Sequence, residues 1–122
     1  MEKVDMLTAL KKYAVFSGRA RRKEYWLFML FFVLVHFAAG VLDGLCSSPE
    51  ADSELFGTLV LLALMMPELA VSVRRLHDIG KSGWWLLLWF VPFIGPIVLL
   101  IFTLLDSEAG DNQYGPYPKA EL

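Results

Sequence analysis

The stretch RRLHDIGKSGWW, Arg74–Trp85, holds the residues of this 122-residue chain whose types and order could do chemistry. Within it, Gly80-Lys81-Ser82 matches the last three residues of a phosphate-binding loop motif. That motif also needs a glycine five residues before Gly80 and a preceding β-strand. Arg75 stands at that earlier position, and long apolar runs flank the motif on both sides. We therefore expect no nucleotide binding, and the glycines are better explained as turn residues, with Ser82 capping a following helix.

His77 and Asp78 are the second chemical feature of this motif, because an imidazole beside a carboxylate can transfer protons. Catalysis would also need a nucleophile or a metal ion. The other histidine, His36, lies about halfway along an apolar run, at a different depth from His77. The single cysteine, Cys46, excludes an internal disulfide and a cysteine metal cluster. We expect no catalytic residue, no metal site, no cofactor and no enzyme activity.

Apolar residues make up 57% of the chain, more than the roughly 45–50% usual in soluble proteins. A soluble domain of this size exposes too much of its surface to hide that excess from water. The excess lies in three runs, at residues 26–45, 55–73 and 84–105. Each matches a helix that crosses a hydrocarbon core of about 30 Å. The sequence predicts one all-α integral membrane domain over residues 1–122, with three transmembrane helices.

The third run differs from the others because it contains Pro92, Gly95 and Pro96, which kink or break helices. A re-entrant hairpin would return the tail to the side from which the run began. Its 22 residues, however, make only about 33 Å of helix, and two full passes need about 40 residues. We therefore predict a kinked single pass.

Lysine and arginine are strongly biased toward one side of the predicted crossings. Ten of the eleven lie before the first run or between the second and third: Lys3, Lys11, Lys12, Arg19, Arg21, Arg22, Lys23, Arg74, Arg75 and Lys81. The loop between the first two runs, DGLCSSPEADSE, contains none. Because basic residues near membrane ends tend to stay in the cytoplasm, we predict a cytoplasmic N-terminus. Three crossings then place the C-terminus and an extended tail, residues 106–122, in the periplasm.

The segment before the first crossing is amphipathic. Apolar residues recur at helical spacing, at Val4, Leu7, Leu10 and Ala14, with lysines between them. This pattern predicts an N-terminal interfacial helix over residues 3–15, lying on the cytoplasmic face. The first 24 residues are too polar to hold the apolar region of a secretion signal, so we expect no cleaved leader.

Three polar motifs surround the apolar runs in a recognisable order: FSGRARRKEYW at Phe16–Trp26, RRLHDIGKSGWW at Arg74–Trp85, and GDNQYGPYP at Gly110–Pro118. In this order the chain resembles the bacterial inner-membrane family known as domain of unknown function 805, the YhaH-like proteins. The resemblance covers nearly the whole chain. It implies a small integral protein of the bacterial inner membrane and supplies no activity, substrate or cofactor.

The first two motifs meet on the cytoplasmic side in the predicted topology. The candidate binding residues that they bring together are Arg19, Arg21, Arg22, Arg74, Arg75, His77, Asp78 and Lys81. These charges could serve only to fix topology, but that role needs no defined order of residues. We hypothesise that His77 and Asp78 pair with arginines of the first motif to form a basic cytoplasmic cap. The cap would bind anionic lipid headgroups, another anion or a partner protein.

Glu68 is an acid inside the second apolar run, and ionisable groups at such positions are costly and often functional. It lies seven residues before Arg75, two helical turns away, so we expect the two to form an ion pair. The alternative pairs Glu68 with His36 as a proton or cation relay.

These patterns predict a non-enzymatic binding, scaffolding or envelope-regulatory protein. The alternative is a subunit of an oligomeric transporter or channel, since three crossings provide little wall for a pore. The expected partners are the phospholipid membrane and either a partner protein or a second copy of the chain. The small residues Ala38, Ala39 and Gly40 would permit close approach of helices in such an oligomer. No nucleic acid is expected.

Overall fold

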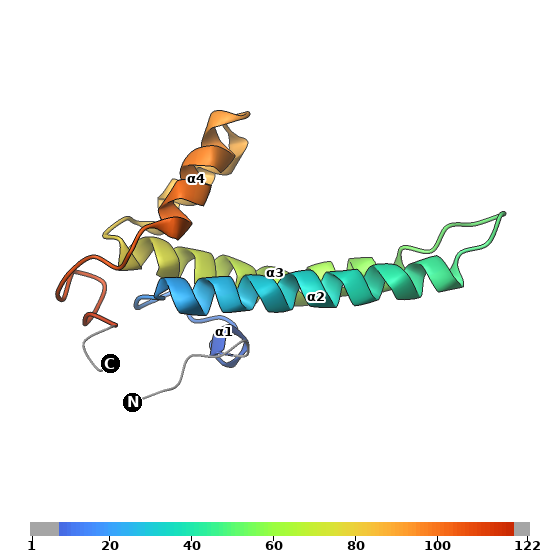
Figure 1. Ribbon diagram of the computed structural model, residues 1–122, viewed down its shortest axis with the longest axis horizontal. Coiled ribbons are helices and arrows are strands. Elements are labelled where there is room, and N and C mark those ends of the chain that lie inside the picture. Colours follow the sequence, from blue (N-terminus) through green and yellow to red (C-terminus); the bar gives the residue numbers. More distant parts are fainter. Residues whose placement is uncertain (1–7, 119–122) are drawn as a thin grey trace.

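A computed structural model describes residues 8–118, and every regular element within them is a helix. The elements in chain order are α1 (Thr8–Lys11), α2 (Arg22–Cys46), α3 (Leu55–Asp78), the 3₁₀-helix η1 (Gly83–Phe90) and α4 (Ile94–Leu104). Two long helices form the body of the molecule, and the shorter elements gather near one end of it (Figure 1).

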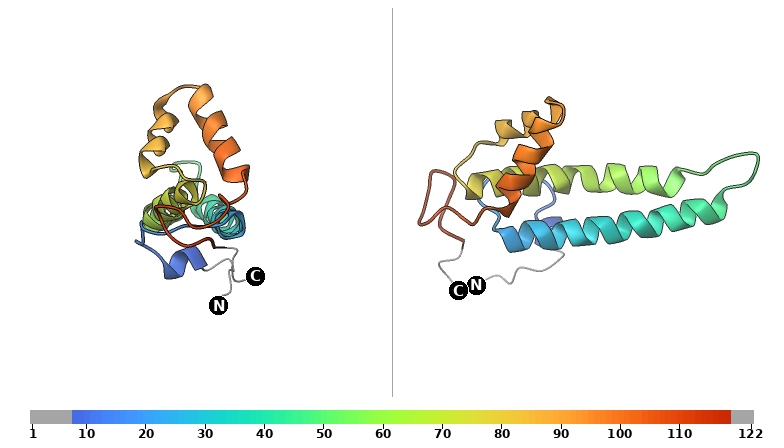
Figure 2. Two further views of the ribbon diagram at one scale, coloured as in Figure 1. Left: turned by 90° about the vertical axis from the view of Figure 1, so that its left-hand side faces the viewer. Right: turned by 45° about the horizontal axis from the view of Figure 1, so that its top comes forward.

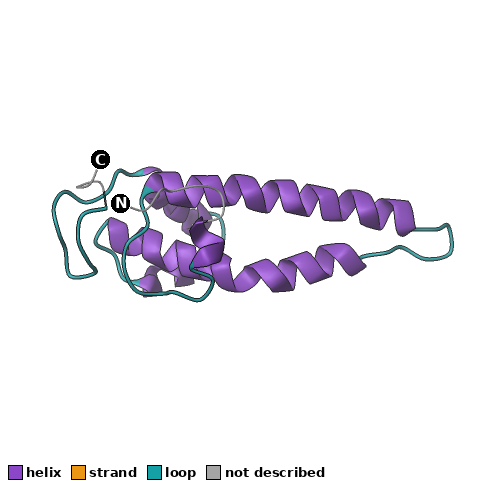
Figure 3. Cartoon of the chain, turned by 90° about the horizontal axis from the view of Figure 1, so that it is seen from below, coloured by secondary structure: helices purple, strands orange, loops and turns teal. Residues whose placement is uncertain are grey.

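The helices α2 and α3 form an antiparallel hairpin of 25 and 24 residues. Figure 3 shows them side by side, joined by one loop at the far end. Both are long and apolar enough to cross a membrane. Their outer faces carry exposed apolar side chains, such as Phe37 with 72% of its surface accessible. The hairpin corresponds to the first two predicted crossings, and its apolar surface suits contact with lipid.

Asp43, near the end of α2, caps the start of α3. Its Oδ1 accepts a hydrogen bond from the backbone N–H of Phe56, and its Oδ2 accepts one from Gly57, both at 2.8 Å. The first N–H groups of a helix lack partners within the helix, and a carboxylate also suits the positive end of the helix dipole. This contact, which the sequence did not suggest, fixes the two helices at the loop end.

The third apolar run is divided, so the single kinked helix predicted over residues 84–105 is not formed and a third transmembrane helix is not confirmed. The chain turns between η1 and α4 at Pro92 and Phe93, and Phe93 has a positive φ of 66°. Figure 2 shows the two arms folded back along each other. Close approach is possible because a Cβ on Gly95 would overlap the backbone carbonyl of Leu88.

The short helix α1 packs against the hairpin. Thr8 and Ala9 are fully buried, and Ala9 shares a small core with Ala20, Phe28 and Val71. Helix α1 ends at Lys11, before the predicted end of the interfacial helix at residue 15. Residues 3–7 of that prediction lie outside the described residues, so its N-terminal half stays a prediction.

We expect Gly95→Ala to lower the free energy of unfolding by about 1–3 kcal/mol, because the added methyl group overpacks the turn between η1 and α4. Denaturation in mixed detergent micelles would measure the change. The matched control is Gly40→Ala on α2, where the added Cβ would meet no described atom within 4 Å apart from its chain neighbours and the adjacent backbone of its own helix. That control should leave stability unchanged or slightly raised. Equal effects of the two substitutions would contradict the close approach at Gly95.

Candidate functional site

The first two polar motifs and the tail meet at one end of the α2–α3 hairpin. The backbone N–H of Ala20 donates to the carbonyl of Arg74 at 2.9 Å, and that of Glu108 donates to the carbonyl of Asp78 at 2.7 Å. The structure thus adds the tail to the predicted cap, which comprises residues 15–24, 74–81 and 103–117. In Figure 1 the red tail lies beside the start of α2 and the end of α3.

Asp78 is the centre of the cap. Its side chain is completely buried, and its Oδ1 accepts a hydrogen bond from Nε of Arg19 at 3.0 Å. Its Oδ2 accepts one from Nη1 of Arg75 at 2.8 Å and another from the hydroxyl of Ser107. One carboxylate therefore joins the first motif, the second motif and the tail.

Arg19 binds the backbone of the tail with the donors that Asp78 leaves available. Its Nη1 donates to the carbonyl of Gly110 at 2.8 Å, and its Nη2 donates to the carbonyl of Glu108 at 2.6 Å. Only 1% of its side chain is exposed. A planar guanidinium suits this role because its donors point in several fixed directions at once. Arg19 therefore holds the tail through backbone groups.

Arg74 and Arg75 are equally buried, with 1% of each side chain exposed. Arg74 forms an ion pair with Glu24, and its Nε donates to the carbonyl of Val15 at 3.0 Å. Arg75 donates to the carbonyl of Leu105, in addition to Asp78. The two arginines therefore contact different neighbours of α3, Arg74 at the start of α2 and Arg75 at the end of α4.

The buried arginine cluster, Arg19, Arg74 and Arg75 with Asp78 and Glu24, holds three positive and two negative groups. Buried charges are costly unless they are paired and hydrogen-bonded. Here the remaining positive charge is offset by backbone carbonyls and by the negative C-terminal end of α3. Removal of Glu24, Arg74 or Asp78 leaves a buried charge without its ion-pair partner, and removal of Arg19 or Arg75 leaves buried carbonyls without a donor, so the cluster fixes the shape of the cap.

We expected His77 to pair with an arginine of the first motif, but within residues 8–118 it makes other contacts. Its Nδ1 lies 2.9 Å from the carbonyl oxygen of Gly18, and its ring stacks on Tyr114 with centroids 4.0 Å apart. Its own carbonyl accepts a hydrogen bond from Nδ2 of Asn112 at 3.0 Å. Gly18 has a positive φ of 90°, which turns the chain so that its carbonyl can meet the imidazole. His77 thus joins the first motif to the tail through the backbone and through ring stacking.

The other three predicted binding residues lie at the surface of the cap. Arg22 is exposed, donates to the carbonyl of Leu104 at 3.1 Å and lies 3.8 Å from a carboxylate oxygen of Asp106. Arg21 is half-buried, and its Nε has no hydrogen-bond partner within residues 8–118. Lys81 places its ammonium 5.3 Å from the ring centroid of Trp85. The eight predicted residues therefore divide into five that hold the cap together and three on its surface.

Glu68 lies apart from this cluster, and the expected ion pair with Arg75 is not present within the described residues. The two residues are two turns apart, whereas Asp78 lies one turn from Arg75 and takes its guanidinium. The Oε1 of Glu68 accepts a hydrogen bond from the hydroxyl of Ser72 at 3.4 Å, and its Oε2 has no partner within residues 8–118. The Nδ1 of His36 lies at hydrogen-bond distance, 2.9 Å, from the backbone carbonyl of Phe32. Within residues 8–118 His36 makes no hydrogen bond to Glu68.

Sequence reasoning missed two side chains that bind the buried charges of the cluster. Glu24 is the acid within the first motif, and Ser107 is the second residue of the tail. An acid inside a basic motif was a usable signal, since a lone carboxylate among arginines favours an ion pair. Nothing in the sequence distinguished Ser107 from other polar residues of the tail.

We expect Arg75→Lys to be nearly as destabilising as Arg75→Gln, at about 3–5 kcal/mol, because each leaves acceptors of the buried cluster without donors. An ammonium keeps the charge but cannot reach Asp78 and the carbonyl of Leu105 from one planar group. Unfolding in mixed micelles would measure both variants. Arg22→Lys, at an exposed arginine, is the control and should change stability by less than about 1 kcal/mol. A stable Arg75→Lys variant would reduce the role of Arg75 to its charge.

Comparison with known proteins supports the interpretation of the motifs. The family model described as protein of unknown function DUF805 matches residues 13–116. The inner membrane protein YhaI of Escherichia coli K12 is 46% identical over 93% of both chains, and the inner membrane protein YhaH is 41% identical over 94% of this chain and 96% of its own. The uncharacterized protein YiiR of the same strain is 30% identical over 82% of this chain and 83% of its own.

No solved structure matches the chain. The transporter or channel alternative gains no support from the relatives, two of which are named only as inner membrane proteins. The apolar hairpin, the three motifs and these relatives agree, and the chain is a small membrane protein that belongs to the DUF805 family of unknown function.

Proposed function

We propose that this protein is a non-enzymatic binding or scaffolding protein of the bacterial inner membrane that presents a rigid cap on the cytoplasmic side. The observation that carries the proposal is the buried arginine cluster, which joins three segments distant in the sequence around Asp78. So many buried charges are excessive for fixing topology alone, since that role needs only positive charge near a membrane end. They suit a surface whose shape must be kept.

The side chains of the cap that could act as a general acid or base instead stabilise its structure. Asp78 accepts three hydrogen bonds from neighbouring side chains, and the ring of His77 contacts Gly18 and Tyr114. A general acid or base must be within reach of a substrate proton. These contacts direct both groups toward the protein itself, which favours a binding role over catalysis.

Both ends of the chain lie on the cytoplasmic side in this proposal. The positive-inside rule assigns the basic cap to the cytoplasm, and the tail is part of the cap. We therefore infer a cytoplasmic C-terminus, in place of the periplasmic one expected from three crossings. The hairpin of η1 and α4 then enters the membrane from the cytoplasmic side and returns to it. Its tip carries Phe90 and Phe93, which are 82% and 86% exposed and suit an apolar environment.

The surface that meets anionic headgroups is the start of α2. Arg21, Arg22 and Lys23 follow one another there, and Arg22 and Lys23 are exposed. Each basic residue near an anionic leaflet gains about 1 kcal/mol. The buried arginines position this surface, and the surface residues make the contact.

Cysteine labelling in cells with a permeabilised outer membrane tests the topology. We expect a membrane-impermeant thiol reagent to label Cys46, which is exposed at the loop end of the hairpin. A variant with Cys46→Ser and Gln113→Cys moves the thiol to an exposed position of the tail. That variant should be labelled only after the inner membrane is opened. Labelling of the tail in intact spheroplasts would contradict a cytoplasmic C-terminus.

Retention of phosphatidylglycerol during purification tests the lipid contact. We expect the double variant Arg21→Gln with Lys23→Gln to bind this lipid at least tenfold more weakly, because two charges worth about 1 kcal/mol each are removed. Native mass spectrometry would measure the binding. The control exchanges the same residues with charge kept, Arg21→Lys with Lys23→Arg, and should bind as the unchanged protein does. Unaltered binding by the glutamine variant would exclude this surface as the lipid contact.

A further inference from the structure

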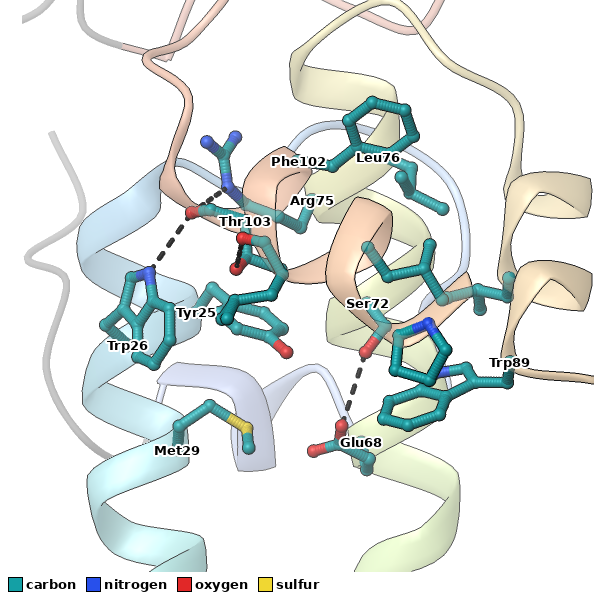
Figure 4. A pocket seen from close by; sticks show the side chains of 14 residues that line it. Tyr25, Trp26, Met29, Glu68, Ser72, Arg75, Leu76, Trp89, Phe102 and Thr103 are labelled. Atoms are coloured by element: carbon teal, nitrogen blue, oxygen red, sulfur yellow. Dashed lines mark hydrogen bonds between the residues drawn. The ribbon is translucent and has the colours of Figure 1, made fainter. Parts of the chain in front are cut away.

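A cavity of about 220 Å³ lies below the cap, between the α2–α3 hairpin and the hairpin of η1 and α4. Its walls are mostly apolar and include Met29, Trp89 and Leu99. Figure 4 shows the Glu68 carboxylate and the hydroxyls of Tyr25 and Ser72 turned toward the same part of it. Apolar walls with a few convergent polar groups are typical of sites for small organic ligands.

The charge of this site is set by Glu68. Its Oε1 accepts a hydrogen bond from Ser72, and its Oε2 is buried without a hydrogen-bond partner within residues 8–118. Arg75 also lines the cavity, but its guanidinium donates to Asp78 and to backbone carbonyls of the cap. The acceptor that remains available to a ligand is therefore a carboxylate oxygen, and such an acceptor suits a cation.

The aromatic walls suit the same kind of ligand. Tyr25 and Trp89 line the cavity near Glu68, and aromatic ring faces attract ammonium groups, most strongly when water is excluded. The cavity is partly open, and its lining residues Trp26 and Leu100 are 38% and 51% exposed, so that they join it to the outer surface. An alkyl chain attached to the ammonium could leave through this opening along the apolar outer surface.

We propose that this cavity binds a lipophilic primary amine, with its ammonium on Glu68 and its alkyl chain directed outward between α2 and α4. A phospholipid with an ammonium headgroup is disfavoured, because its phosphate would need a second cationic partner and the guanidinium of Arg75 is engaged in the cap. This inference concerns a different surface from the lipid contact of the cap. Failure of either proposal therefore leaves the other standing.

Native mass spectrometry of the protein in a neutral sugar detergent tests the proposal. The probes are dodecylamine, dodecanol and lysophosphatidylethanolamine. We expect one dodecylamine to bind per chain, at least tenfold more tightly than dodecanol, and Glu68→Gln to remove that preference. The matched control is Glu54→Gln, at an exposed acid of the α2–α3 loop, which should keep it. Equal binding of amine and alcohol by the unchanged protein would overturn the proposal without any variant.

Two further outcomes are decisive. If lysophosphatidylethanolamine binds as tightly as dodecylamine and depends equally on Glu68, the assignment to a phosphate-free amine is wrong. Ser72→Leu keeps the acid but fills the polar part of the cavity, and it should lose amine binding while the protein elutes as the same monodisperse species. Unchanged amine binding by Ser72→Leu would place the ligand outside this cavity.

Discussion

A carboxylate buried at the end of a membrane hairpin must be paired, and the pairing of Asp78 determines much of the rest of this structure. Its partners Arg19 and Arg75 are themselves buried charges that need further acceptors. Most of those acceptors are backbone carbonyls of residues 103–115, which lie at this end because the chain returns there. The electrostatic requirement of one acid is thus met by folding the tail back onto the cap.

The return of the tail constrains the third apolar run. Its 22 residues must leave the end of α3 and come back to the same end, which one continuous helix cannot do. Two short arms satisfy this requirement, provided that their backbones can approach closely at the turn. Gly95 allows that approach beside Leu88, and Pro92 ends the first arm. The divided run and the buried arginine cluster therefore depend on each other.

The sequence was sufficient to predict the helical class and the two long helices, because the length of an apolar run indicates a membrane-spanning helix. It was also sufficient to predict that the first two polar motifs meet, because the bias of lysine and arginine places them on one side. It was insufficient for the third run, since the same prolines and glycine fit either a kinked helix or a hairpin. The partner of Arg75 was also misjudged. Glu68 and Asp78 both lie on the face of Arg75 in a helix, and burial of Asp78 by the tail decides between them. Spacing along one helix cannot contain that information.

The cap and the cavity share structural parts, which links the shape of one to the other. Helix α4 provides a wall of the cavity through Leu99 and ends beside the carbonyl of Leu105, which Arg75 holds. In Figure 4 the guanidinium of Arg75 points away from Glu68, while the stem of its side chain borders the cavity. Loss of the arginine would release the end of α4 and the cavity wall together. The position of α4 against the hairpin, and with it the width of the cavity, therefore depends on hydrogen bonds made in the cap.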